Sequence, residues 1–194
     1  EKALWLHDWL IFNADYDESM TVHAARGVLL DGTGVCESYA LAYQMLLGEI
    51  GIPSIYVTGY ARGELHAWNL VNLEDEWYHI DATVGGGNEG YGYFGLSDQL
   101  MGRDHDWTFQ NYVFPAAEGE QFNYLKRNGA LQFADETEMD AVLSEAMAAK
   151  KTPIDYMYTG PDLYFYATDQ VSTWLKNNRS KFGIDTWTQH GSRF

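Results

Sequence analysis

The chain has 194 residues and a formal charge of −16, from 28 acidic and 12 basic side chains. With 46% hydrophobic and 15% aromatic residues it is long and apolar enough to bury a core, which excludes an intrinsically disordered chain. The negative charge argues against nucleic-acid binding, which requires a basic face. A single cysteine excludes an intramolecular disulfide and a zinc site of several cysteines. No apolar stretch reaches the roughly 18 residues of a membrane-spanning helix.

The first part of the chain is predicted to form helices followed by an antiparallel sheet. The spacing of apolar residues and the Gly or Pro residues that interrupt it predict three helices, at residues 2–13, 23–30 and 35–50. The second is short, and the third has the clearest helical pattern. Runs rich in Tyr, Val, Ile and Trp, joined by short polar turns, predict three strands at 54–60, 65–73 and 76–81. Consecutive strands with such short turns favour a meander.

The charge is unevenly distributed. Residues 1–115 hold 17 acidic and 4 basic side chains, whereas residues 116–194 hold 11 and 8. The change falls at the stretch that begins with Pro115, and we predict two domains, 1–115 and 116–194.

The second part is predicted to be a small α/β appendage. Its elements are expected in the order β-α-β-β-α-β, at residues 130–134, 135–151, 154–159, 163–167, 168–182 and 184–188. This order matches a split βαβ unit. The helix at 135–151 is well marked, since Asp135 is a good N-cap and Pro153 lies beyond its end. The segment shows no catalytic constellation, and its role stays open.

Cys36 is the first candidate for chemistry, because it follows a Gly-rich turn and opens a predicted helix. The helix dipole and the unpaired N–H groups of the first turn stabilise a thiolate, the reactive form of cysteine. The same N–H groups can bind the oxyanion of a tetrahedral intermediate. The alternative is a small, buried apolar residue, the commonest role of a lone cysteine.

His66 and Asp81 strengthen the catalytic hypothesis. If a two-residue loop joins the second and third strands, the residue numbers of each facing pair add up to an odd number. An even-numbered residue on one strand then shares a face of the sheet with odd-numbered residues on the other, so His66 and Asp81 project from the same face. They are then either directly opposite or diagonal neighbours, within side-chain reach. An Asp beside a His can orient the imidazole and stabilise its charged form, as in a nucleophile–base–orienter triad.

The segments that carry these residues resemble three motifs of the transglutaminase-like superfamily. They are Gly-Val-Cys-Glu-Ser-Tyr-Ala at 34–40, His-Ala-Trp-Asn at 66–69 and Trp-Tyr-His-Ile-Asp-Ala-Thr at 77–83. The resemblance covers about residues 3–110, and the flanking segments 13–17 and 93–94 also resemble features of the family's bacterial members. One departure is Val84, where members commonly have Trp.

The resemblance implies an α+β, papain-like core in which a Cys-bearing helix packs on an antiparallel sheet. It implies Cys36 as nucleophile, His66 as general base and acid, and Asp81 as orienter. The second oxyanion donor or substrate-binding group stays open among Trp68, Asn13, Tyr16 and Gln44.

We expect no cofactor and no metal. Residues 85–90 fit the pattern GxGxxG, but no helix follows as a dinucleotide site requires. No histidine pair has the i, i+4 spacing of a helical metal site, and His105, between two aspartates, is expected in a solvated loop. Trp68, Trp77, Tyr78 and Tyr93 are either a platform for a peptide or sugar, or core residues.

The preferred hypothesis is a thiol enzyme that acts on amide bonds through an acyl-enzyme, by hydrolysis or by amine transfer. The expected substrate is a protein or peptide, with a cationic or cell-wall peptide favoured by the charge. The alternatives are a non-catalytic cell-surface module that binds peptide or carbohydrate, and a redox-sensing thiol. We expect an extracytoplasmic location, with which the lack of disulfide pairing is compatible, and a start inside a helix suggests a trimmed precursor.

Overall fold

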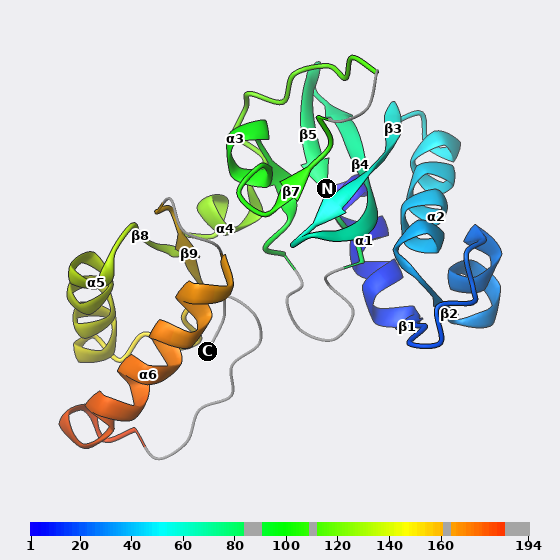
Figure 1. Cartoon of the computed structure of the whole chain (residues 1–194). Coiled ribbons are helices and arrows are strands. Elements are labelled where there is room, and N and C mark those ends of the chain that lie inside the picture. Colours follow the sequence, from blue (N-terminus) through cyan, green and yellow to red (C-terminus); the bar gives the residue numbers. More distant parts are fainter. Residues whose placement is uncertain (84–90, 109–111, 161–163, 185–194) are drawn as a thin grey trace. The chain divides into compact units, whose positions relative to one another are not determined.

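The computed structural model describes residues 1–83, 91–108, 112–160 and 164–184 (Figure 1). The chain forms two compact units, Glu1–Tyr124 and Leu125–Phe194, and each is described by itself. The glycine-rich segment that fits GxGxxG lies outside the described residues. In the described part of the chain, no helix is both long and apolar enough to span a bilayer.

The helices of the first unit agree closely with the prediction. The first helix is α1 (Lys2–Asn13), and the strong helix that opens at the cysteine is α2 (Cys36–Glu49). The short helix between them is instead a π-helical turn, η1 (Gly27–Asp31), which ends at Gly32 with a φ of 73°. Buried Leu10 of α1 and Tyr43 of α2 share one apolar cluster with strand residues Val71 and Ile80.

An antiparallel five-stranded sheet forms the other half of this core. Its order is β6-β5-β4-β3-β7, with bounds Phe94–Leu96, Glu76–Ile80, Glu64–Leu73, Ser54–Ala61 and His105–Asp106. The predicted meander is β3, β4 and β5. Helix α2 packs on β3 and β4 (Figure 1). The predicted α+β class, with a Cys-bearing helix on an antiparallel sheet, is confirmed.

The β4–β5 hairpin has the expected two-residue loop. Glu74 and Asp75 both have positive φ, 54° and 69°, as a type I′ turn requires. Leu73 faces Glu76 and Asn69 faces Ile80, so facing residues sum to 149. This register places the residues after Ile80 beside the first half of β4, where His66 lies.

The short elements of the first unit were not predicted. They include the parallel pair β1 (Asp15–Tyr16) and β2 (Thr33–Gly34), the strands β6 and β7, and the four-residue helices α3 (Asp98–Met101) and α4 (Tyr124–Arg127), which lies at the boundary between the units. Elements of two to four residues are too short for a hydrophobic period to be recognised.

The second unit contains a βαβ arrangement. Strands β8 (Leu131–Phe133) and β9 (Tyr156–Tyr158) pair in parallel, and α5 (Glu136–Ala148) lies between them in the chain. Asp135 caps α5 as predicted, because its carboxylate accepts the N–H groups of Thr137 and Glu138 at 2.8 and 2.9 Å.

The strand predicted at 163–167 is wrong, because α6 (Tyr164–Phe182) already includes residues 164–167. A five-residue aromatic run does not distinguish a strand from the first turn of a helix. The expected β-α-β-β-α-β order is therefore not what the described residues form. Most of the last strand predicted, 184–188, lies outside them.

Gly59 offers a test of the close packing around the sheet. It faces His66 across β3 and β4, and a Cβ there would lie 2.6 Å from Cη2 of Trp68 and clash with the carbonyl of Asp106. We expect Gly59→Ala to lower the free energy of unfolding by about 1–3 kcal/mol, since an overpacked core must shift. Urea denaturation measures this change.

Gly48→Ala is the matched control, because its Cβ would meet nothing within 4 Å in α2. We expect it to stabilise the protein by about 0.5–1 kcal/mol through helix propensity. Equal effects of the two substitutions would contradict the packing at Gly59.

Candidate active site

Cys36 is the first residue of α2, as predicted. Val35 precedes the helix in an extended conformation and supplies no side-chain cap. The thiol is 9% exposed and packs with Ala40, Ala67 and the partly buried Tyr56. The first-turn N–H groups have no acceptor within the helix and point toward its N-terminal end, where the thiol lies. This is a setting in which a thiolate gains stability.

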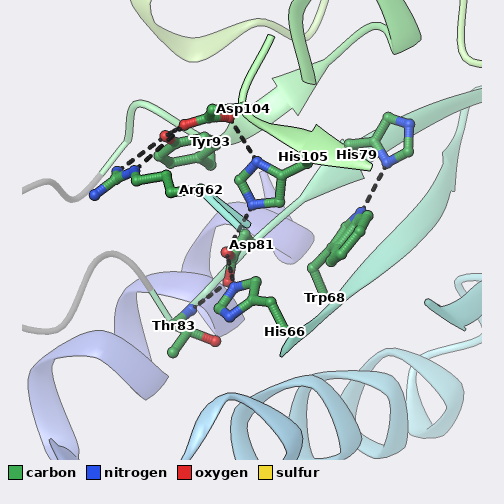
Figure 2. Close-up of polar contacts among 9 residues, drawn as sticks. All are labelled: Arg62, His66, Trp68, His79, Asp81, Thr83, Tyr93, Asp104 and His105. Carbon is green, nitrogen blue, oxygen red and sulfur yellow. Dashed lines mark hydrogen bonds and ion pairs between the residues drawn. The ribbon is translucent and has the colours of Figure 1, made fainter. Parts of the chain in front are cut away.

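His66 and Asp81 are brought into direct contact. Nε2 of His66 lies 2.6 Å from Oδ2 of Asp81, a short hydrogen bond to a carboxylate that can only accept (Figure 2). In the observed register Asp81 continues toward the position opposite Trp68, so it is the diagonal neighbour of His66. The parity argument from the sequence therefore placed both side chains on the correct face.

Asp81 is held rigidly. It is 1% exposed, its other oxygen, Oδ1, accepts the N–H of Thr83 at 2.8 Å, and its own N–H donates to the carbonyl of Tyr93 at 3.1 Å. Burial by itself would raise the pKa of this carboxyl. The charge of His66 and the interactions with His105 and His66 outweigh burial and hold the pKa well below its usual range.

Cys36 and His66 also interact, through a hydrogen bond between the thiol and the imidazole. Burial opposes ionisation of the thiol, but a hydrogen bond with His66, the charge of His66 and the N–H groups of Ala67 and Glu37 lower its pKa. Burial likewise opposes charge on His66, yet Asp81 and then Cys36 raise its pKa to about 10. Because Nε2 is engaged with Asp81, Nδ1 is the nitrogen left for the thiol. The arrangement favours a thiolate–imidazolium pair.

Three of the four candidates for the second donor use their N–H groups elsewhere. Trp68 is fully buried and its Nε1–H donates to Nδ1 of His79 at 2.9 Å. The side-chain amide of Asn13 donates to the carbonyl of Trp9 at 2.7 Å, and that of Gln44 to the carbonyl of Ser54 at 3.2 Å. Among the described residues, each of these three groups thus donates a hydrogen bond to a partner other than Cys36.

Tyr16 is the candidate that does lie beside Cys36. It pairs with Gly34 in the β1–β2 ladder, two residues before the cysteine. Burial and the charge of Cys36 raise the pKa of its phenol, and a hydrogen bond from the backbone N–H of Cys36 opposes them. The phenol oxygen is therefore close to both the thiol and the first N–H of α2, while its hydroxyl donates to Sδ of Met20 at 3.6 Å.

His105 is the residue that the sequence reasoning missed. It was expected in a solvated loop, but it is only 4% exposed, because β7 pairs with β3 and places it opposite Ala61. Its Nδ1 hydrogen-bonds Oδ1 of Asp104 at 2.6 Å, and its Nε2 lies 3.7 Å from Oδ2 of Asp81 (Figure 2). The Asp-His-Asp run was visible, but a two-residue strand leaves no pattern to find.

The aromatic residues of this region belong to the core. Trp68 and Tyr78 are fully buried, Tyr93 is 6% exposed, and Trp77 is partly buried against the same cluster. The platform interpretation is therefore wrong for the three buried rings, Trp68, Tyr78 and Tyr93. These rings pack against the sheet, and the ring centroids of Trp68 and His105 lie 5.0 Å apart.

His66, Asp81 and His105 offer potential metal ligands within 4.8 Å of one another. Two tetrahedral ligands about 2.0–2.1 Å from one zinc ion stand roughly 3.3 Å apart. The 2.6 Å between His66 and Asp81 is shorter and is a hydrogen-bond distance. The spacing of His66 and Asp81 is therefore that of a hydrogen-bonded pair.

Comparison with known proteins shows what the N-terminal part of the chain is similar to. Residues 1–82 match the family model of the transglutaminase-like superfamily. The kyphoscoliosis peptidases of Mus musculus and Homo sapiens are each 27% identical to this chain, over 44% of its length. The match spans only 15% of the length of these curated relatives.

Two solved structures are also similar. A candidate cysteine protease from Cytophaga hutchinsonii is 29% identical, with a TM-score of 0.39 over 42% of this chain and 30% of the other. A TGase is 12% identical, with a TM-score of 0.39 over 95% of this chain and 44% of the other.

Proposed function

We propose that the protein is a thiol enzyme that cleaves amide bonds through an acyl-enzyme on Cys36, a proposal supported by the match of residues 1–82 to the family model of the transglutaminase-like superfamily. The observation that carries this proposal is the buried 2.6 Å bond between His66 and Asp81, beside a cysteine at the start of a helix. An oriented imidazole next to a thiol of lowered pKa is the arrangement that nucleophilic catalysis requires.

In the proposed reaction, His66 takes the thiol proton and the sulfur attacks the carbonyl carbon of the amide. The C–N bond then breaks, and His66 gives its proton to the departing amine. Water, deprotonated by His66, attacks the thioester, which releases the carboxylic acid and restores the thiol. Asp81 keeps the imidazole oriented and stabilises its charged form throughout.

An amine in place of water would produce a new amide, that is, transfer. We favour hydrolysis, and the names of the two relatives, which are called peptidases, support this choice.

The oxyanion of the tetrahedral intermediate would be bound by the N–H of Cys36 and by the hydroxyl of Tyr16. The N–H has no acceptor within α2 and hydrogen-bonds the phenol oxygen of Tyr16, whose hydroxyl donates to Sδ of Met20. Both donors would turn to the oxyanion when it forms. Tyr16 is partly exposed, so a substrate carbonyl can reach it.

Acidic residues at the edge of this site favour a cationic substrate. Glu18 and Glu64 are exposed. Burial and the charge of Cys36 are the larger causes of the raised pKa of Tyr16, and the charges of these two glutamates raise it further. A lysine-bearing peptide would be drawn toward such a field.

Alkylation of the thiol tests the central proposal, and the single cysteine makes the label specific. At pH 6.5 an ordinary thiol is only about 1% thiolate, so Cys36 should react with iodoacetamide at least about tenfold faster than free cysteine. His66→Ala and Asp81→Ala should slow this reaction and abolish amide hydrolysis. His79→Gln, a buried histidine that contacts neither Cys36 nor Asp81 in the described residues, is the control.

Labelling at the rate of free cysteine, insensitive to both substitutions, would rule out the enzyme and favour the binding module. Reversible oxidation without amide turnover, and without dependence on Asp81, would favour a redox-sensing thiol.

Tyr16→Phe tests the oxyanion role. We expect kcat to fall by about 10²–10³-fold with little change in the rate of alkylation, because the hydroxyl acts only once the oxyanion forms. Tyr56→Phe also removes a phenol near Cys36 and is the matched control, with a much smaller loss expected. An unchanged kcat in Tyr16→Phe would exclude this residue as the donor.

The charge of the substrate can be tested with two peptides that differ only by lysine or norleucine. Raising the salt concentration from 20 to 200 mM shortens the Debye length to below about 10 Å, so kcat/KM should fall more for the lysine peptide. Glu18→Gln and Glu64→Gln should reduce the difference. Equal salt sensitivity of the two peptides would mean that the negative charge of the protein does not attract the substrate and only keeps the protein soluble.

A further inference from the structure

His105 is a buried titratable group that the proposed reaction does not use. Its side chain is 1% exposed and lies between two buried carboxylates, Asp81 on the Nε2 side and Asp104 on the Nδ1 side. Its Nε2 makes no hydrogen bond with any described residue, although it lies 3.7 Å from Oδ2 of Asp81. This is the same oxygen that accepts the hydrogen bond of His66, so two imidazoles converge on one carboxylate oxygen (Figure 2).

Asp104 is held in place from the other side. Its Oδ2 accepts the hydroxyl of Tyr93 and lies 3.5 Å from Nε of Arg62, while Nη2 of Arg62 donates to the hydroxyl of Tyr93 at 3.1 Å. Its Oδ1 remains for His105. The carboxylate therefore fixes the ring of His105, and with it the direction of Nε2.

The charges of the cluster favour a protonated His105. Burial opposes charge on this ring, but the interactions with Asp104 and Asp81 raise its pKa. With His105 charged, three cations balance three anions in the cluster: His66, His105 and Arg62 against Cys36, Asp81 and Asp104. A neutral His105 would leave a net buried negative charge.

The other groups that surround the ring of His105 cannot supply a positive charge in its place. The rings of Tyr93 and Trp68 contact it at 5.1 and 5.0 Å between centroids. Burial lowers the pKa of His79 and the charge of His105 lowers it further, so His79 stays neutral.

We propose that His105, held by Asp104, is a positioning residue. Its positive charge beside Asp81 limits how strongly Asp81 stabilises the protonated ring of His66, and so sets how readily His66 gives up its Nδ1 proton. This inference rests on the proposed function. If Asp81 interacted with His66 alone, the imidazolium would be stabilised so strongly that giving its proton to the leaving amine would be slow. A second cation on the same oxygen weakens that hold, while Oδ2 stays aligned with His66.

The titration of His66 tests this proposal without a substrate. With Cys36 blocked by methylthiolation, the pKa of His66 depends mainly on Asp81 and burial, and NMR can follow it because the chain has only six histidines. The His66→Gln spectrum identifies its signal. We expect His105→Gln to raise the pKa of His66 by about one unit, since a unit charge at this range acts through an effective dielectric of about 20. Asp104→Asn should act in the same direction.

His79→Gln is the matched control, because His79 is equally buried, contacts Trp68 and pairs with Asp98 rather than Asp81. It should leave the titration of His66 unchanged. No shift in His105→Gln, or an equal shift in His79→Gln, would overturn the proposal. If both His105→Gln and Asp104→Asn fail to fold, the protonation of His105 in the wild-type protein decides: a neutral ring at pH 7 would overturn it.

The same variants separate this proposal from the proposed function. An unactivated thiol in the wild-type protein would refute the enzyme, whereas an activated thiol with an unshifted His66 would refute only the role of His105. In an active enzyme, His105→Gln should move the upper step of the pH–rate profile for alkylation to higher pH and lower kcat more than it raises KM.

Discussion

The hydrogen bond between His66 and Asp81 is the interaction on which the rest of the site depends. It joins a carboxylate with no exposed side-chain surface to an imidazole that is only 13% exposed, so each relies mainly on the other to keep its charge. Burial alone would drive both groups toward their neutral forms. Once the pair exists, the imidazole is oriented, and a nearby thiol can ionise against it.

The backbone accounts for the precision of this bond. A two-residue turn with positive φ at both positions sets the register of β4 against β5, and this register makes His66 and Asp81 diagonal neighbours. Helix α2 packs on β4, where Asn69 donates to the carbonyl of Ala40 at 3.0 Å and links the two elements. The helix that carries the thiol and the strand that carries the imidazole are thereby held together.

Much of this arrangement was predictable because its elements are long. Helix α2 and strands β3 to β5 contain five or more residues each and show clear periodicity and turn residues. The donor set around Cys36 was less predictable, since whether Asn13 or Gln44 reaches the thiol depends on hydrogen bonds made within the fold. The error at 163–167 has a similar origin, because a short aromatic run has no period of its own.

The sequence by itself determined the α+β class, the position of Cys36 at a helix start and the shared face of His66 and Asp81, because these follow from local turns and from the two-residue period of a strand. The tertiary structure decided that Tyr16 stands next to the thiol and that Asp81 interacts with two imidazoles. Strand β7 has only two residues, and it is the pairing of these residues with β3, more than forty positions earlier, that buries His105. Contacts between residues so distant in the chain depend on how the whole core packs, which no local pattern encodes.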